Sequence, residues 1–190
     1  SRLRDPNMGG PVPVGLVGVV GEDFRVGDWE MLESRGLDLS GIERAEGSTF
    51  RWRGRYHGSM DEAETLETQL NVFGEFEPKI PAGWTSPEVL FCGNIHPAIQ
   101  AAVLDSCSGA KFTALDSMNL WIEIQRDALE KVVAQTDLLF LNDAEALAFT
   151  GAASLDAAGA ALLAAGPRFV VIKRGAKGAT LFHANGNARI

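Results

Sequence analysis

The sequence predicts an α/β protein with a mainly parallel sheet and a small antiparallel β insertion. Short, nearly continuous apolar runs alternate with helical patterns along most of the chain. Such runs are expected of parallel strands buried on both faces, and their alternation with helices indicates a sheet with helices on both faces. Residues 49–56 and 65–73 instead alternate apolar and polar side chains, which is typical of antiparallel strands with one solvated face.

The composition narrows the class of protein. The 190 residues are 46% hydrophobic and 22% charged, which fits one globular domain or a piece of one. The net charge of -8 argues against nucleic acid as a partner, because nucleic-acid binding needs a basic surface. No run approaches the roughly 20 apolar residues that span a bilayer, so no membrane partner is expected. Two cysteines cannot form a disulfide framework, so we expect a cytoplasmic protein.

Residues 1–48 are expected to begin the α/β domain. The apolar run Val12–Val20 predicts a buried strand, and apolar residues at helical spacing predict a helix over Val26–Ser34. Gly36 is placed to end this helix. The stretch Leu37–Ile42, for which no element is predicted, then leads into a different kind of sequence.

Residues 49–76 are expected to form a β-sheet insertion with two strands, Thr49–Tyr56 and Thr65–Phe73. The first strand places aromatic side chains on one face and arginines on the other. Arg51 and Arg53 are candidate substrate contacts, because guanidinium groups bind phosphate and carboxylate through paired hydrogen bonds. The alternative is a solvated face whose arginines pair loosely with acidic residues of the second strand.

Residues 77–190 return to alternating strands and helices and form the remainder of the α/β domain. The predicted strands are Glu88–Cys92, Phe112–Leu115, Asp137–Leu141 and Phe169–Ile172, followed by a hairpin of Ala179–Phe182 and Ala188–Ile190. The predicted helices are Ala98–Leu104, Arg126–Val133, Ala144–Phe149 and Leu155–Ala165. Open parallel sheets bind ligands beyond the carboxyl ends of their strands, so residues that follow the strands are site candidates.

Asn142 and Glu145 follow the buried strand Asp137–Leu141, at the start of the next helix. A helix start is an anion site, because its free N–H groups and its dipole face the ligand. A carboxylate and an amide there are suited to hydrated Mg²⁺, which keeps several waters and takes few protein ligands. The alternative is a capping box, in which Asn is the N-cap and Glu reaches back to it.

Lys173, Gly175 and Gly178 follow the strand Phe169–Ile172. Two glycines three residues apart permit close approach of the backbone to a nucleotide, and the lysine can offset phosphate charge. The alternative is a glycine-rich turn with solvated basic side chains. The spacing differs from that of a Walker A loop.

Three more candidates follow other strands. Asp116 and Asn119 come after Phe112–Leu115, where a ligand is expected, and Asn94 follows Glu88–Cys92 as a candidate substrate contact. The alternative for Asp116 and Asn119 is an ordinary polar loop anchored by Trp121.

Taken together, these segments resemble the ribokinase-like (PfkB) family of sugar and nucleoside kinases. The resemblance begins at Val19-Val20-Gly21-Glu22-Asp23-Phe24, continues through Gly36-Leu37-Asp38 and covers about residues 14–190. The insertion Thr49–Phe73 is similar to the β-sheet lid that covers the sugar in this family. Asn142-x-x-Glu145 is similar to its motif linked to Mg²⁺ and phosphate, and Lys173-x-Gly175-x-x-Gly178 to its nucleotide-contacting loop.

The resemblance implies a ribokinase-like three-layer α/β/α fold and an ATP-dependent kinase. Such an enzyme transfers the γ-phosphoryl group of ATP to a hydroxyl of a small-molecule sugar or nucleoside and uses Mg²⁺. It also implies a homodimer formed through the lid. By this resemblance Asn142 and Glu145 organise Mg²⁺ through water, while the residues that line the nucleotide and phosphates are Lys173, Gly175, Gly178, Asp116 and Asn119.

Two motifs of the family are not found in the sequence. One is Gly-Ala-Gly-Asp, which supplies the anion hole and the Asp base; the other is an amino-terminal Gly-Gly sugar motif, of which Gly9-Gly10 is a remnant. The resemblance therefore implies a fragment with its catalytic Asp expected beyond Ile190, and we expect negligible kinase turnover from this chain alone. The alternative is a non-catalytic kinase-like module that binds a nucleotide or a protein partner.

Overall fold

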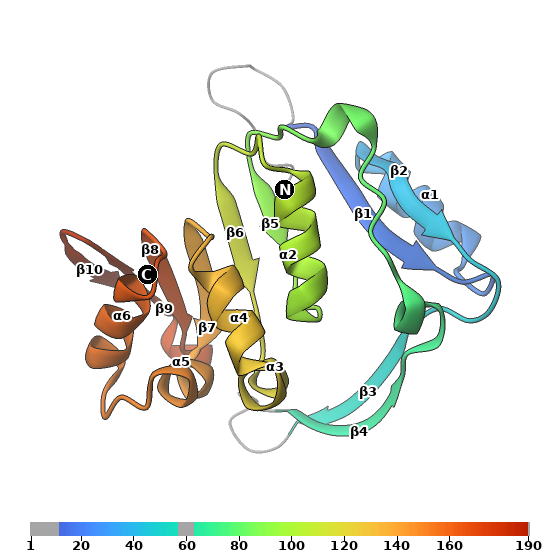
Figure 1. Cartoon of the computed structure of the whole chain (residues 1–190). Helices are drawn as coiled ribbons and strands as arrows, with labels where there is room; N and C mark the ends of the chain where they lie inside the picture. Colours follow the sequence, from blue (N-terminus) through green and yellow to red (C-terminus); the bar gives the residue numbers. More distant parts are fainter. Residues whose placement is uncertain (1–11, 57–62, 190) are drawn as a thin grey trace. The chain divides into compact units, whose positions relative to one another are not determined.

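The computed structural model describes residues 12–56 and 63–189 (Figure 1). The Gly9-Gly10 pair and Ile190 lie outside the described residues. The chain divides into two compact units, Ser1–Ala82 and Gly83–Ile190. The segments that the sequence assigns to the start of the α/β domain and to the insertion both fall in the first unit.

The first unit contains a parallel strand pair, a helix and an antiparallel strand pair. Its elements are β1 (Val14–Val20), α1 (Val26–Ser34), β2 (Leu37–Arg44), β3 (Arg51–Tyr56), β4 (Ala63–Gln69) and η1 (Asn71–Glu75), with η2 (Ala82–Trp84) at the boundary. No element was predicted for Leu37–Ile42, but these residues belong to β2 and pair in parallel with β1. Leu39 is buried between the exposed Asp38 and Ser40, and Gly41 is buried two residues later, so this part of the strand alternates with a period of two.

β3 and β4 form the antiparallel pair that the sequence predicts. The register shifts after Arg53 and passes over Leu66, so the alternation of faces is interrupted there. The prediction of a strand as far as Phe73 is wrong, because Asn71 adopts a φ of 50° and η1 begins. Trp52 and Leu66 are 43% and 41% exposed, so the pair has large apolar side chains at its surface.

The carboxylate of Asp23 ties the end of β1 to the start of β3. It accepts hydrogen bonds from the Thr49 backbone N–H at 2.6 Å and the Thr49 hydroxyl at 2.8 Å, and it pairs with Arg51 at 2.6 Å. These contacts lower the pKa of Asp23 to about 2, and the hydrogen bond from the Thr49 backbone contributes most to the shift. Gly21 donates its N–H to the Thr49 hydroxyl at 3.0 Å, and a Cβ at Gly21 would overlap the Gly47 carbonyl. The close approach of the two backbone segments at Gly21 and Gly47 therefore requires glycine at position 21.

The second unit is built on a six-stranded sheet of order β10-β9-β8-β7-β6-β5. Its strands are β5 (Leu90–Cys92), β6 (Thr113–Asp116), β7 (Leu138–Asn142), β8 (Phe169–Lys173), β9 (Ala179–His183) and β10 (Gly186–Arg189). Its helices are α2 (Pro97–Ser106), α3 (Asn119–Ile124), α4 (Arg126–Val133), α5 (Asp143–Thr150), α6 (Leu155–Ala164) and the 3-10 turn η3 (Gly175–Lys177). Only α3 and η3 were not predicted; α3 begins at Asn119, where an ordinary polar loop was the alternative.

Strands β5 to β8 are parallel, while β9 and β10 form the predicted antiparallel hairpin at one edge. Because β5 to β8 are parallel, their carboxyl ends lie together along one end of the strands, which we call the carboxyl edge of the sheet. This edge carries the candidate residues of the second unit.

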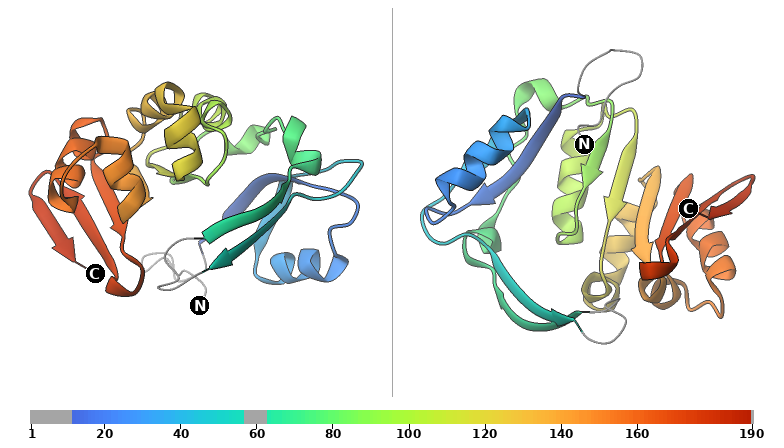
Figure 2. Two further views of the ribbon diagram at one scale, coloured as in Figure 1. Left: turned by 90° about the horizontal axis from the view of Figure 1, so that it is seen from below. Right: turned by 180° about the vertical axis from the view of Figure 1, so that it is seen from behind.

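The helices of the second unit lie against one face of its sheet (Figure 2). Leu139, Leu141 and Ile172 point to that face and are fully buried. The intervening Phe140 and Val171 are partly exposed, and Phe91 is 57% exposed. The sequence predicts helices on both faces of the sheet. Within residues 83–189, the helices cover only one face of the six-stranded sheet.

The core of the second unit joins the helices to the sheet. Leu129 of α4 and Leu162 of α6 are fully buried with the apolar residues of β7 and β8. Gly159 of α6 lies against Phe182 of β9, and a Cβ at position 159 would overlap the Phe182 ring. Removal of a buried leucine side chain from such a core costs about 2–5 kcal/mol.

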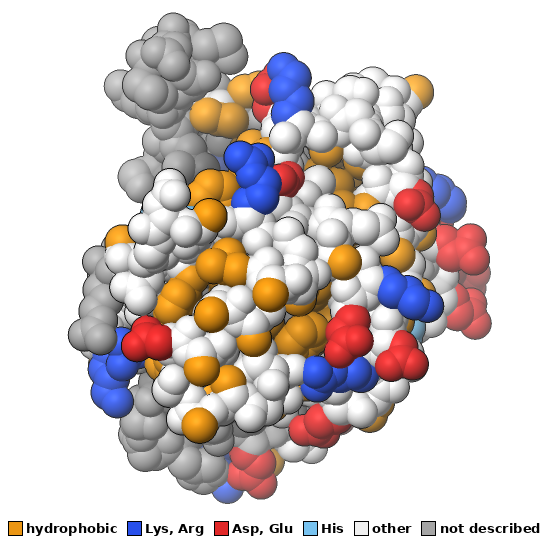
Figure 3. Space-filling model, turned by 60° about the vertical axis from the view of Figure 1, so that its left-hand side comes forward, with side chains coloured by type: hydrophobic (Ala, Val, Ile, Leu, Met, Phe, Trp, Pro, Cys, Tyr) orange, Lys and Arg blue, Asp and Glu red, His pale blue; other side chains and the backbone are white. Residues whose placement is uncertain are grey.

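Within the described part of the chain, no single helix is long and apolar enough to span a membrane. The consecutive helices α5 and α6 reach that length and apolarity only together, and they are bent by 61° at their break. On the face drawn in Figure 3, acidic and basic side chains are interspersed with small apolar groups.

Candidate functional site

The carboxyl edge of the parallel strands brings Asp116 and Lys173 into direct contact. Lys173 Nζ lies 2.9 Å from Asp116 Oδ1. Asp116 ends β6 and Lys173 ends β8, so the ion pair spans β7, which lies between them. Asn142 is in register with Lys173, and Asp116 with Phe140. Since Phe140 and Asn142 are two residues apart, all of these side chains share one face of the sheet.

Asn142 and Glu145 form a capping box at the start of α5. Asn142 Oδ1 accepts the Glu145 backbone N–H at 2.8 Å, and Glu145 Oε2 accepts the Asn142 backbone N–H at 2.7 Å. The local alternative predicted from the sequence is thus present. Its presence leaves the ligand role of the two residues as a prediction, because a cap at a strand end can also face a ligand.

Glu145 is a buried carboxylate in a charged neighbourhood. Burial is the largest influence and raises the pKa of Glu145. The bond from the Asn142 backbone and the charge of Lys173 oppose this shift, while the charges of Asp116 and Asp143 add to it. Glu145 therefore interacts electrostatically with both members of the ion pair.

The loop after Lys173 is a closed turn. Arg174 donates its backbone N–H to the Gly178 carbonyl at 2.8 Å, and Gly178 donates to the Gly175 carbonyl at 3.1 Å. Gly175 and Gly178 have φ values of 52° and 81°, which favour glycine. These values explain both glycines by backbone conformation alone, and their nucleotide contacts stay a prediction.

Asn94 lies at the same edge, in the loop after β5. Its Oδ1 accepts the Trp121 indole N–H at 2.9 Å. The ring of His96 meets Trp121 edge to face, with the ring centroids 5.1 Å apart. Trp121 thus anchors the loop after β5, whereas the sequence suggested that it anchors the loop that contains Asp116 and Asn119. Asn119 is exposed as the first residue of α3.

Arg51 and Arg53 lie in the first unit and have local partners. Arg51 pairs with Asp23, and Arg53 pairs with Glu67 at 3.1 Å. The predicted alternative, an arginine face paired with acidic residues of β4, is therefore present at Arg53. Their role as substrate contacts stays a prediction.

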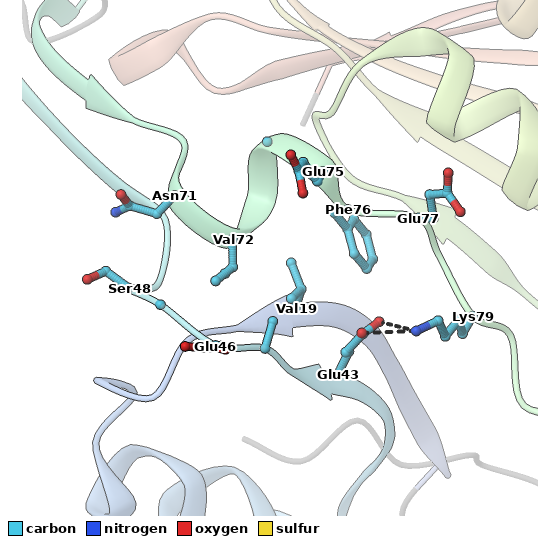
Figure 4. A pocket seen from close by; sticks show the side chains of 13 residues that line it. Val19, Glu43, Glu46, Ser48, Asn71, Val72, Glu75, Phe76, Glu77 and Lys79 are labelled. Carbon is cyan, nitrogen blue, oxygen red and sulfur yellow. Dashed lines mark hydrogen bonds and ion pairs between the residues drawn. The ribbon is translucent and has the colours of Figure 1, made fainter.

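A groove of about 730 Å³ opens in the first unit (Figure 4). Acidic side chains line it, among them Glu46, Glu75 and Glu77, and Lys79 pairs with Glu43 at 2.9 Å. None of the candidate site residues named from the sequence lines this groove.

Among residues 12–56 and 63–189, no group of three or more His, Cys, Asp or Glu side chains is placed to hold a metal ion. In addition, Glu145 Oε2 and Asn142 Oδ1 are engaged in the capping box. A cage made of protein side chains alone therefore does not fit. Hydrated Mg²⁺ does fit, because it is usually held by one or two carboxylates together with phosphates of the substrate.

Sequence reasoning missed Gln100, which connects two loops at this edge. Its side chain is fully buried on α2 and donates to the backbone carbonyls of Gly93 and Asp116. The signal in the sequence was a polar residue within the otherwise apolar segment Ala98–Leu104.

The fold and this edge define an open parallel-sheet α/β protein with a polar candidate ligand site at the carboxyl ends of its strands. Residues 80–190 match the family described as pfkB family carbohydrate kinase, which is more than half of the chain. The chain therefore belongs to the pfkB family, as its motifs suggested.

A curated relative supports this assignment. The chain is 31% identical over 173 residues to a cytidine kinase of Thermococcus kodakarensis, a match that covers 89% of this chain. The chain spans 61% of the length of that relative.

Solved structures confirm the ribokinase-like fold. A PfkB protein from Polaromonas sp. JS666 has a TM-score of 0.75 and 18% identity, over 94% of this chain and 66% of that one. A putative ribokinase II from E. coli in complex with ATP and Mg²⁺ has a TM-score of 0.74 and 20% identity, over 94% and 62%. A nucleoside kinase from Methanocaldococcus jannaschii has a TM-score of 0.71 and 15% identity, over 94% and 58%.

Proposed function

We propose that the chain carries the nucleotide-binding part of an ATP-dependent kinase that phosphorylates a hydroxyl of a nucleoside or sugar. Membership of the pfkB family supports phosphoryl transfer. The similarity to a cytidine kinase favours a nucleoside as the acceptor. The complex of a structural neighbour with ATP and Mg²⁺ supports these two ligands.

The observation that carries the proposal is the Lys173–Asp116 ion pair beside the start of α5. Lys173 supplies a positive charge for the phosphates of ATP, and Asp116 holds its ammonium group at the edge of the sheet. Both side chains are partly exposed, so a phosphate can compete with Asp116 for the lysine. Gly175 and Gly178 have no side chains, so the loop backbone can approach the nucleotide.

Asn142 and Glu145 are proposed to face the same phosphates. Glu145 and Asp116 are the carboxylates suited to hydrated Mg²⁺ at this edge, through water. Mg²⁺ held there would supply positive charge that neutralises the charge developing on the phosphates. The residues of this chain bind and orient the nucleotide, which is the main contribution in phosphoryl transfer.

The proposal is tested by titrating the purified chain with Mg·ATP in a calorimeter. Lys173→Met should weaken binding by about tenfold or more, since a charge-assisted contact to phosphate is lost. Lys111→Met is the matched control, because Lys111 pairs with Glu88 at 2.6 Å before β6, away from the carboxyl edge. Absence of Mg·ATP binding by the unmodified chain, or equal effects of the two variants, would falsify the proposal.

Turnover is assayed separately with cytidine, other nucleosides and sugars. The family's Gly-Ala-Gly-Asp element is not found in the 190 residues, so we expect nucleotide binding with negligible phosphorylation. Robust phosphorylation that Glu145→Gln abolishes would contradict this expectation and place a base within the chain.

A second candidate function is self-association through β3 and β4. The pair exposes the large apolar side chains of Trp52 and Leu66, and those of Phe50 and Leu70, next to the strand ends, are also exposed. Such a surface favours pairing with a second copy. Analytical ultracentrifugation should show a dimer that Trp52→Glu dissociates, and a monomer at all concentrations would exclude it.

A further inference from the structure

Gln100 is a fully buried polar side chain at the candidate site. Its exposed fraction is 0%, and it sits in α2 beside Pro97 and Leu104, which are also buried. Its Nε2 donates to the backbone carbonyl of Gly93 at 2.8 Å and to that of Asp116 at 3.0 Å. Gly93 directly follows β5, and Asp116 ends β6. One side-chain amide thus joins two neighbouring strand ends.

The two acceptors determine which way this amide points. Both are carbonyl oxygens, so the NH₂ group must face them and Oε1 must point away. Gln100 Oε1 and Ser117 Oγ are buried, and neither has a hydrogen-bond partner among the described residues. An unpaired buried acceptor costs about 1–3 kcal/mol, which offsets much of what the two bonds contribute to stability. Stability alone therefore explains this glutamine poorly.

The contacts of Gln100 instead order the site. Gly93 immediately precedes Asn94. The Asn94 side chain has a second anchor, because its Oδ1 accepts a hydrogen bond from Trp121 Nε1 at 2.9 Å. The Asp116 carbonyl belongs to the residue that pairs with Lys173. Gln100 thereby sets the distance between the loop that carries Asn94 and the strand end that carries the ion pair.

We propose that Gln100 is a positioning residue of the nucleotide site: its amide holds the ends of β5 and β6 so that Asn94 and Asp116 face the ligand together. This inference rests on the proposed nucleotide binding. Gln100 itself is buried and does not touch the ligand. Loss of its amide loosens both loops and weakens nucleotide binding without removing any ligand contact.

The test compares Gln100→Met with Thr136→Val. Methionine retains the length of the side chain and loses both hydrogen bonds. Thr136 is also buried and donates its hydroxyl to the Val132 carbonyl at 2.6 Å, but it precedes β7 at the opposite edge of the sheet. Both variants lose buried bonds to the backbone, and only one loses them at the site. For each, three quantities are measured: the denaturant midpoint, the Kd for Mg·ATP and amide hydrogen exchange.

Gln100→Met should raise the Kd by about ten- to a hundredfold, the range for residues that orient ligand-binding groups. It should also accelerate amide exchange in residues 93–96 and 116–119. Thr136→Val should lower the midpoint without either effect. A Kd for Gln100→Met that rises no more than that for Thr136→Val overturns the proposal.

A second measurement uses the unmodified chain and does not depend on the folding of a variant. The side-chain amide signals of Gln100 in an NMR spectrum should be protected from exchange and should shift on addition of Mg·ATP. Signals that exchange freely, or that do not respond to bound nucleotide, overturn the proposal. If the unmodified chain binds no nucleotide, the proposed function fails. Amide exchange in residues 93–96 and 116–119 of Gln100→Met, compared with the unmodified chain, then still decides whether Gln100 holds the two loops.

Discussion

Lys173 Nζ lies 2.9 Å from Asp116 Oδ1, although 57 residues separate the two in the chain. Their strands flank β7, which leads directly into the capping box of α5. The ion pair therefore spans the junction of β7 and α5, which carries Glu145, the carboxylate whose pKa is raised. The ion pair, the Glu145 carboxylate and the start of α5 therefore lie together at this edge.

Asp116→Asn should affect nucleotide binding far more than folding. The side chains of the ion pair are 46% and 28% exposed, and pairs of this kind contribute about 0–1 kcal/mol to stability. The free energy of unfolding in urea should therefore fall by less than about 1 kcal/mol. The Kd for Mg·ATP should rise by about tenfold, because Lys173 loses the partner that orients it. Glu88→Gln, which breaks the Lys111 pair, should leave the Kd unchanged.

Glu145→Gln should become relatively more stable as the pH rises. Burial raises the pKa of Glu145 above its ordinary value of 4.5, so the folded chain holds this proton more tightly than the unfolded chain. The stability that Glu145 contributes is then present below pH 4.5 and is lost as the pH rises through the folded pKa. Glutamine retains the cap without the charge. Urea unfolding of both proteins between about pH 4 and pH 7 checks the trend, and a constant difference would contradict it.

Asp23→Asn should have the opposite dependence on pH. The pKa of Asp23 is lowered to about 2, so its contribution is present above the ordinary value of 3.8 and is lost as the pH falls through about 2. Amide exchange at Thr49, whose N–H donates to Asp23, should be much faster in the variant at pH 5, and the difference from the unmodified chain should shrink as the pH falls through about 2. Asp28→Asn, which breaks an ion pair with Arg25 at the start of α1, is the control and should not alter exchange at Thr49.

Gly159→Ala should destabilise the second unit, whereas Gly27→Ala should not destabilise the first. Both glycines lie in helices, but a Cβ at Gly159 would overlap the Phe182 ring and one at Gly27 would meet no atom within 4 Å. Overpacking of a core costs about 1–3 kcal/mol. An exposed helical glycine replaced by alanine gains about 0.5–1 kcal/mol. Thermal unfolding of the two variants measures both signs.

The spacing of residues along the sequence correctly predicted contacts between residues that are only a few positions apart. Asn142 and Glu145 are three residues apart at a helix start, so their reciprocal hydrogen bonds followed from the sequence. The apolar runs of β7 and β8 likewise predicted buried parallel strands. β2 was missed because its short alternation of Leu39 and Gly41 with polar residues carries little apolar signal.

Contacts across the sheet required the structure. The Lys173–Asp116 pair depends on the order of β6, β7 and β8 and on their register, which spacing along the chain does not specify. The contacts of Gln100 depend on where α2 packs above two strand ends. The shift at Leu66 and the left-handed backbone of Asn71 depend on how two strands meet, so the predicted end of β4 was four residues too late.

The capping box gives Asn142 and Glu145 two tasks at once, helix initiation and the proposed contact with the phosphates. A mutational scan scored only by nucleotide binding would count any loss at either position as a lost ligand contact, even if α5 had merely unfolded. An N-cap replaced by alanine costs about 0.5–2 kcal/mol, enough to lower the abundance of a marginally stable protein. Abundance and nucleotide binding scored in parallel for the same library would separate the two tasks. Glutamine at position 145 is the informative substitution, since it preserves the cap while removing the charge.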